Sequence, residues 1–168
     1  MTQLIRLARI ADAARCAEIY RPFVTDNWVS FETEPPDMQD MAQRIGSYGE
    51  SHAWLVAEDE AGRVIGYAYA SPHRSRAAYD TSADVAVYVD PAAARLGIGR
   101  ALYAALFPLL REKGIHAVFS GIALPNPASI GLHEAMGFTP VGIYREVGWK
   151  MGGWRDVGWW QLVLSDTP

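Results

Sequence analysis

The stretch Tyr88-Val89-Asp90-Pro91-Ala92-Ala93-Ala94-Arg95-Leu96-Gly97-Ile98-Gly99-Arg100 decides the fold of this chain. A predicted strand ends here, a turn containing two glycines follows, and a helix is predicted to begin at about Gly99. The amino end of a helix leaves backbone N–H groups unpaired and carries partial positive charge. Glycines let a ligand approach those N–H groups closely. The segment therefore predicts a cradle for a pyrophosphate, with Arg95 and Arg100 adding positive charge.

The pattern Gly-x-Gly before a helix is by itself a weak signal, because many helices begin after glycines for steric reasons alone. The segment lacks the third glycine and the acidic residue of the dinucleotide-binding fingerprint, and it lacks the lysine of a P-loop. A phosphate-binding turn of another kind and an ordinary helix start are both compatible with this segment alone.

The predicted elements on either side of the turn alternate between strands and helices. Asp12 is expected to cap the first helix, and Asp37 opens the second, which places Met38, Met41 and Ile45 on one side. The pattern predicts one α/β domain over residues 1–168, with a mixed, mostly antiparallel sheet of about seven strands flanked by about four helices. Strands are predicted over residues 4–8, 53–58, 63–70, 83–90, 115–122, 138–146 and 157–164, and helices over residues 12–24, from 37, 99–113 and 127–136.

The bulk composition excludes several classes of protein. A net charge of −4 and a pI of about 5.5 argue against a nucleic-acid binder, which must neutralise phosphates. No apolar run is long enough to span a bilayer, and Met1–Arg6 lacks the basic-then-apolar pattern of a secretion signal. We therefore expect a cytoplasmic protein that binds no membrane. Cys16 is the single cysteine, which excludes an internal disulfide and a cysteine metal cluster, and we expect no metal.

Two landmarks give the glycine turn its meaning. The stretch Arg95-Leu96-Gly97-Ile98-Gly99 is similar to the acetyl-CoA-binding motif of the GNAT superfamily of N-acetyltransferases. Further along, Asn126-Pro127-Ala128-Ser129 and Leu132-His133-Glu134-Ala135-Met136-Gly137-Phe138 resemble that superfamily's second landmark, a helix running into Gly-Phe before a strand. The order strand, turn, helix, strand, helix, Gly-Phe, strand matches the fold of the superfamily.

Within the superfamily the sequence most resembles the phosphinothricin acetyltransferase group, over nearly the whole chain. This resemblance implies acetyl-CoA-dependent acetylation of the α-amino group of phosphinothricin, methionine sulfoximine or sulfone, or a similar small amino acid, by direct attack on the thioester. It also implies a homodimer. Two departures are Ala94, where the family motif usually has Gln or Arg, and Asp84, where related enzymes carry a glutamate. The resemblance rests on residues 30–35, 54–58, 78–80, 87–89, 124–126 and 152–158.

Asp84 is the candidate catalytic base. Strand alternation places it on one face with Ala86 and Tyr88, inside an otherwise apolar run. A carboxylate can take the proton that an amine must lose before it attacks a thioester, directly or through a water. Partial burial would raise its pKa toward a useful value. The alternative is an aspartate on a solvent-facing side of the sheet.

The resemblance also implies which residues hold acetyl-CoA. Backbone N–H groups of Val87, Tyr88 and Val89 would stabilise the charge that develops on the thioester oxygen. Asn126 and Ser129 would contact the pantetheine arm, although helix capping also explains them. His133 stands where many members place a tyrosine that protonates the leaving thiolate, and it could equally be structural. The pyrophosphate would bind Arg95, Leu96, Gly97, Ile98, Gly99 and Arg100.

The acceptor side is drawn from three loops. Phe31 and Glu32 lie between the first two predicted helices, where the family builds its acceptor site. Arg74 and Arg76 suit a carboxylate or phosphinate, although a solvated loop is the plain alternative, and Tyr79 follows them as a lining residue.

Two features leave wider alternatives. Four of the six tryptophans fall between Trp149 and Trp160, and they suit the core and an oligomer interface, or the walls of a substrate pocket. Two other functions fit the same scaffold: a protein N-terminal or lysine acetyltransferase, and a non-catalytic acyl-CoA sensor. The acceptor loops argue against the first of these functions, and only Asp84 and Ala94 favour the second.

Overall fold

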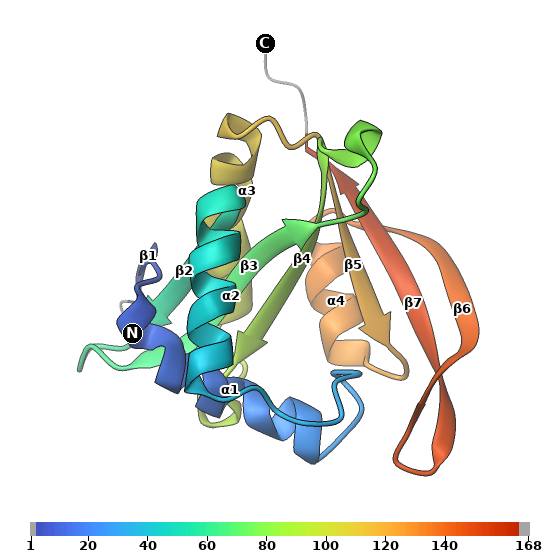
Figure 1. Cartoon of the computed structure of the whole chain (residues 1–168), viewed down its shortest axis with the longest axis horizontal. Coiled ribbons are helices and arrows are strands. Elements are labelled where there is room, and N and C mark those ends of the chain that lie inside the picture. Colours follow the sequence, from blue (N-terminus) through green and yellow to red (C-terminus); the bar gives the residue numbers. More distant parts are fainter. Residues whose placement is uncertain (1–2, 165–168) are drawn as a thin grey trace.

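A seven-stranded sheet in the order β1-β2-β3-β4-β5-β7-β6 runs through the computed structural model, which describes residues 3–164 (Figure 1). Among the described strands, β4 and β5 are the one parallel pair, and the other neighbours are antiparallel. Residues 1–2 and 165–168, at the two ends of the expected domain, lie outside the described residues. The strands are β1 Leu4–Leu7, β2 Ala53–Glu58, β3 Val64–Pro72, β4 Ser82–Val89, β5 Ala117–Ala123, β6 Thr139–Lys150 and β7 Gly153–Val163.

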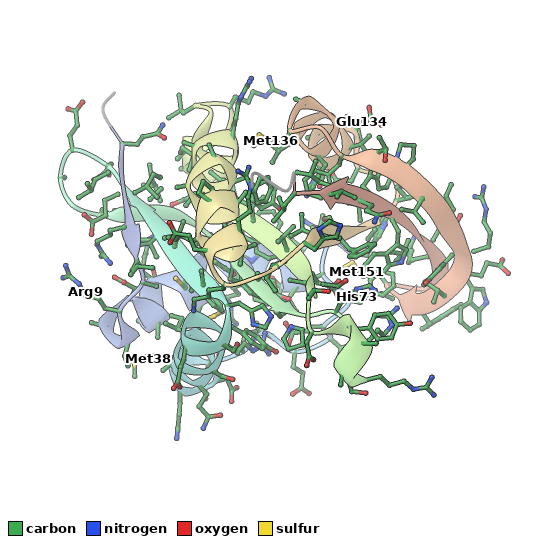
Figure 2. The ribbon with its side chains drawn as sticks, turned by 90° about the horizontal axis from the view of Figure 1, so that it is seen from above. Arg9, Met38, His73, Glu134, Met136 and Met151 are labelled. Carbon is green, nitrogen blue, oxygen red and sulfur yellow. The ribbon has the colours of Figure 1, made fainter. Side chains whose placement is uncertain are left out.

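Within residues 3–164, four α-helices cover the two faces of the sheet, so the predicted fold class is confirmed. Figures 1 and 2 show α1 and α2 on one face and α3 and α4 on the other. Each face has its own core, with Leu102 and Leu106 of α3 under one face and Ile19 and Met41 under the other. Each such side chain contributes about 1.5–3 kcal/mol when fully buried. The helices are α1 Ala13–Thr25, α2 Met38–Ser51, α3 Ile98–Glu112 and α4 Pro127–Ala135, with short 3-10 turns η1 Ile10–Asp12, η2 Ala77–Tyr79 and η3 Pro91–Ala93.

Two expectations about the first helices need correction. Asp12 occupies the N-cap position of α1 as predicted, but its side chain makes no capping hydrogen bond there, because its carboxylate binds the guanidinium of Arg6 and the backbone N–H of Arg9 instead. Met38 does not share the buried side of Met41, and it is 61% exposed. It is the first residue of α2, and Figure 2 labels it beside that helix.

The C-terminal hairpin is longer than the sequence pattern predicts. Strand β6 continues to Lys150 and β7 begins at Gly153, with a register shift between Tyr144 and Gly148. Glu146 within that shift has a positive φ of 51°. Polar and glycine residues there resemble the end of a strand, but a bulge absorbs them and the ladder resumes.

Strands β4 and β5 separate partway along their length, and this separation positions the site. Their parallel register covers only Ser82–Asp84 and Ala117–Phe119, whereas β4 stays paired with β3 as far as Val89. Figure 1 shows the two strands diverging toward their carboxyl ends. Successive N–H groups of a strand point to opposite neighbours. The amides of β4 that point toward β5 beyond Asp84 therefore have no strand partner.

Candidate active site

Three hollows adjoin one another along the gap between β4 and β5. A groove of about 560 Å³ follows the glycine turn, a cavity of about 60 Å³ lies between the strands, and a pocket of about 380 Å³ surrounds Asp84. Val29 and Tyr88 line all three hollows. A long ligand in the groove could therefore reach a second ligand in the pocket.

The groove is built by the turn that opens α3. Gly97 has a φ of +73°, a left-handed conformation that glycine adopts without steric cost. A β-carbon at Gly99 would stand 3.0 Å from Leu132 Cδ2, so glycine lets α3 pack closely against α4. Leu96 is outside the lining, and its carbonyl accepts a hydrogen bond from Gln3 at 3.1 Å. The predicted residues that do line the groove are Val87, Tyr88, Val89, Arg95, Gly97, Ile98, Gly99, Arg100, Asn126 and Ser129.

Asn126 and Ser129 lie where groove and cavity meet. The side-chain oxygen of Asn126 caps α4 by accepting a hydrogen bond from the backbone N–H of Ser129 at 3.1 Å. Both residues line the groove and the cavity as well. Helix capping and a position beside a ligand are therefore compatible roles for Asn126.

His133 lies in the cavity, and both of its ring nitrogens are engaged. Nδ1 is 2.7 Å from the carbonyl oxygen of Ser129, and because a carbonyl only accepts, Nδ1 carries the proton. Nε2 is 3.0 Å from the hydroxyl of Tyr103 and accepts a hydrogen bond from it in the neutral ring. Burial lowers the pKa of His133, which favours that neutral form. The sequence pattern missed Tyr103, because the residue sits on the apolar face of α3 and is typical of core.

The pocket around Asp84 provides the environment that a catalytic base needs. The Asp84 side chain is 31% exposed, and burial raises its pKa above the ordinary range of an aspartate. His73 Nδ1 lies 2.5 Å from Asp84 Oδ1 and acts in the opposite direction, lowering that pKa. Phe31 and Trp159 form aromatic walls of the pocket. The partly buried carboxylate fits the base interpretation better than the solvent-facing one.

Several residues predicted for the acceptor site are engaged elsewhere or exposed. Glu32 binds Arg44 at 2.5 Å and accepts a hydrogen bond from the hydroxyl of Tyr20, so its charge is already paired. Arg74 is exposed, and its guanidinium donates to the backbone carbonyl of His73 at 2.8 Å. Arg76 and Tyr79 are also exposed, and of the predicted acceptor residues only Phe31 lines the pocket. Contact of the other four residues with an acceptor stays a prediction.

The C-terminal tryptophans divide between both of the roles considered for them. Trp160 is buried, and Trp159 lines the pocket around Asp84 with its indole N–H buried and unpaired within the described residues. Trp149 and Trp154 are 59% and 60% exposed and contact each other edge-to-face.

Sequence reasoning also missed His73, because a histidine in a polar loop gives no signal that it contacts Asp84.

The part of the chain that the structure describes contains no group of three or more His, Cys, Asp or Glu side chains arranged to hold a metal ion. Within residues 3–164, no helix is both long and apolar enough to cross a membrane.

Comparison with known proteins gives consistent matches. The family model described as Acetyltransferase (GNAT) family matches residues 13–138. A phosphinothricin N-acetyltransferase of Streptomyces viridochromogenes is 41% identical over 94% of this chain and 85% of its own length. An L-methionine sulfoximine/L-methionine sulfone acetyltransferase of Pseudomonas paraeruginosa is 32% identical over 99% of this chain and 98% of its own. A crystal structure of a phosphinothricin acetyltransferase from Sinorhizobium meliloti in complex with acetyl-CoA superposes with a TM-score of 0.94, at 36% identity, over 99% of this chain and 90% of that one.

Proposed function

Since the chain belongs to the acetyltransferase (GNAT) family and is an N-acetyltransferase, we propose that it transfers acetyl from acetyl-CoA to the α-amino group of a small amino-acid-like acceptor. Phosphinothricin, methionine sulfoximine and methionine sulfone are the proposed acceptors, because related enzymes are named for them. The observation that carries the proposal is the line of hollows from the glycine turn to Asp84.

The groove has the chemistry that a nucleotide thioester requires. Backbone N–H groups at the start of α3, together with Arg95 and Arg100, would hold the phosphates. Apolar side chains of Phe23, Val87 and Leu132 would cover the pantetheine arm. Ala94 also lines the groove, but it is too short to replace the Gln or Arg that the family motif usually has, so the motif loses one contact of several there.

The free amides of β4 would act on the thioester itself. Val87 and Tyr88 line both the groove and the small cavity, beyond the point where β4 and β5 stop pairing. Amides aimed at the thioester oxygen would stabilise its developing charge, an effect that elsewhere contributes about 2.7–4 kcal/mol per donor.

Asp84 would act as the base that frees the acceptor's amine. Most of an α-amine is protonated at neutral pH, and only the neutral amine attacks. One proton passes from the ammonium to Asp84, the neutral nitrogen bonds to the acetyl carbon, the carbon–sulfur bond breaks to release the thiolate, and the nitrogen gives up its second proton to solvent. An aspartate is one methylene shorter than a glutamate, so we propose that a water carries this proton where the amine stands out of direct reach.

His133 has two proposed roles, and its hydrogen bonds favour the structural one. A neutral ring with its proton on Nδ1, bound to the Ser129 carbonyl, has none to give from Nε2. Protonation of the departing sulfur by His133 would require the cationic ring, which burial disfavours. We therefore propose that His133 fixes α4 against α3, and that the leaving thiolate takes its proton from solvent.

We further propose a cytoplasmic homodimer that uses the β6–β7 hairpin as its interface. Edge strand β6 and its partner expose an unusual number of large apolar side chains, which marks an interaction surface. These side chains are Val141, Ile143, Tyr144, Val147, Trp149, Met151 and Trp154.

Release of free thiol from acetyl-CoA, measured over a panel of acceptors, tests the proposed function. We expect turnover with phosphinothricin or the methionine derivatives and none with short peptides. Asp84→Asn should reduce kcat by about 10²–10⁴-fold at saturating acceptor, whereas Asp26→Asn, at an exposed position after α1, should leave kcat unchanged. Turnover on peptides alone would indicate a protein acetyltransferase, and acetyl-CoA binding without turnover on any amine would leave only a sensor.

A further inference from the structure

The side chain of His73 is fixed on several sides next to Asp84. Its ring stacks on Phe119 with centroids 4.4 Å apart and planes 20° from parallel, and it meets the rings of Tyr79 and Trp159 edge-on. The His73 side chain is 13% exposed, and Figure 2 shows it beside the loop that follows β3. A ring held in this way presents Nδ1 to Asp84 in one orientation.

Sheet register brings these residues together. Asp84 on β4 lies opposite Ser71 of β3 on one side and opposite Phe119 of β5 on the other. His73 follows immediately after the last residue of β3, Pro72. It therefore comes off the sheet where its ring can lie on Phe119 and reach the carboxylate next to it.

We propose that His73 is a positioning residue for Asp84: its Nδ1–H holds Oδ1, so that Oδ2 is presented to the amine of the acceptor. This inference rests on the proposed role of Asp84 as base. An ionised carboxylate can only accept, so the 2.5 Å contact places the proton on Nδ1 of His73. During transfer the proton of the amine goes to Oδ2, while Oδ1 keeps its hydrogen bond and His73 gains no proton.

The same contact sets the pH range in which the base works. Burial raises the pKa of Asp84, and the hydrogen bond from His73 and the positive charge of Arg74 lower it. Tyr69 and Tyr88 also line the pocket, but burial raises the pKa of each phenol, so both stay neutral. Phe119 and Trp159 carry no titratable group, and Tyr79 contacts the ring of His73 rather than the carboxylate. Without His73, only Arg74 would oppose the effect of burial.

Two substitutions separate the hydrogen bond of His73 from its packing. His73→Phe keeps a ring on Phe119 and removes the donor, whereas His73→Asn keeps an N–H at the place of Nδ1 and removes the ring. We expect His73→Phe to lower kcat by about tenfold. This loss is smaller than the rate enhancement of about 10²–10⁴-fold that a general base supplies, because Asp84 itself remains. The KM of the acceptor should change by less than about threefold. The acidic limb of the kcat profile should move to higher pH, and His73→Asn should recover most of kcat.

A measurement that needs no turnover tests the role of His73 separately from the proposed acetyltransferase function. The carboxyl carbon of Asp84 can be followed by ¹³C NMR in the full-length protein, and it should titrate at higher pH in His73→Phe than in the wild type. Should His73→Phe not fold, His73→Leu serves as a second donor-free variant. A wild type that acetylates no amine overturns the proposed function, whereas an active wild type whose Asp84 titration and kcat profile survive loss of the donor overturns the role of His73.

Discussion

The ring of Phe31 lies against the backbone of Gly148, so closely that a β-carbon at Gly148 would overlap the ring. This contact joins the loop after α1 to strand β6 and forms one wall of the pocket around Asp84. Trp159 forms another wall and also packs against a glycine, since a β-carbon at Gly121 would stand 3.0 Å from Trp159 Cζ2. Glycines in two strands therefore leave room for two aromatic rings that line the pocket around Asp84.

Gly148→Ala should weaken acceptor binding by pushing Phe31 out of place. Phe31 is partly exposed and can swing toward solvent, so we expect a stability loss below about 1 kcal/mol. The KM of the acceptor should rise about three- to tenfold, with the KM of acetyl-CoA unchanged, as measured by steady-state kinetics. Gly142→Ala is the matched control, because a β-carbon there meets nothing within 4 Å. Equal KM values for the two variants would show that Phe31 does not shape the pocket.

Gly97→Ala should weaken acetyl-CoA binding, because its φ of +73° is strained for alanine by about 1–2 kcal/mol. Gly62, in the turn between β2 and β3, has a φ of +76° and, like Gly97, nothing within 4 Å of an added β-carbon. Gly62→Ala should therefore lose similar stability and bind acetyl-CoA normally. Calorimetric titration of both variants with acetyl-CoA measures their affinities. Equal affinity of Gly97→Ala and Gly62→Ala for acetyl-CoA would rule out the turn at Gly97 as the acetyl-CoA site.

His133→Asn and Tyr103→Phe should act mainly on stability. Each leaves a buried polar group without its partner, which costs about 1–3 kcal/mol in urea unfolding. The kcat of the folded variants should stay within about threefold of the wild type, and a loss beyond about a hundredfold would instead restore a catalytic role for His133. Because folding lowers the pKa of His133, the unfolded chain binds more protons there, so stability should fall as pH drops below about 6.5.

Asp12→Asn should destabilise the protein by about 1.5–3 kcal/mol at pH 7, because it breaks a charged contact with Arg6 at 2.8 Å between mostly buried side chains. The hydrogen bonds from Arg6 hold the pKa of Asp12 below its ordinary value of about 3.9. This stabilisation is therefore fully present above about pH 4 and is lost as pH falls through the folded-state pKa. Glu18→Gln, at the exposed pair with Arg15, should change stability by less than about 1 kcal/mol, and a similar loss from both substitutions would contradict the burial argument.

Trp154→Lys should dissociate the proposed homodimer by placing a charge on the exposed face of the β6–β7 hairpin. Sedimentation analysis should give a dimer for the wild type and a monomer for the variant at micromolar concentration. Leu4→Lys is the control, since Leu4 is also an exposed apolar residue but lies on β1 at the opposite edge of the sheet. A wild type that sediments as a monomer would remove the proposal.

Local sequence determined the glycine turn before α3 and most of the strands and helices. Gly97 could be interpreted without the fold, because the freed amides of a helix start and the left-handed φ that glycine adopts are local properties, whereas the close packing of Gly99 against Leu132 depends on the fold. The bounds of β2 agree with the predicted residues 53–58 for a similar reason, since an apolar run before a turn is a local pattern. Where the pattern was interrupted, as at Glu146 in the bulge of β6, the predicted strand ended too early.

Only the tertiary structure decided what surrounds Asp84. Its partner His73 and the aromatic walls Phe31 and Trp159 come from a loop, another loop and a distant strand, and no local pattern relates them. The register of β3 and β5 on either side of β4 determines which side chains meet, and a shift of one residue would turn each of them to the other face. The sequence by itself therefore determined an acetyl-CoA-type turn and a candidate base, and the paired strands determined what holds that base in place.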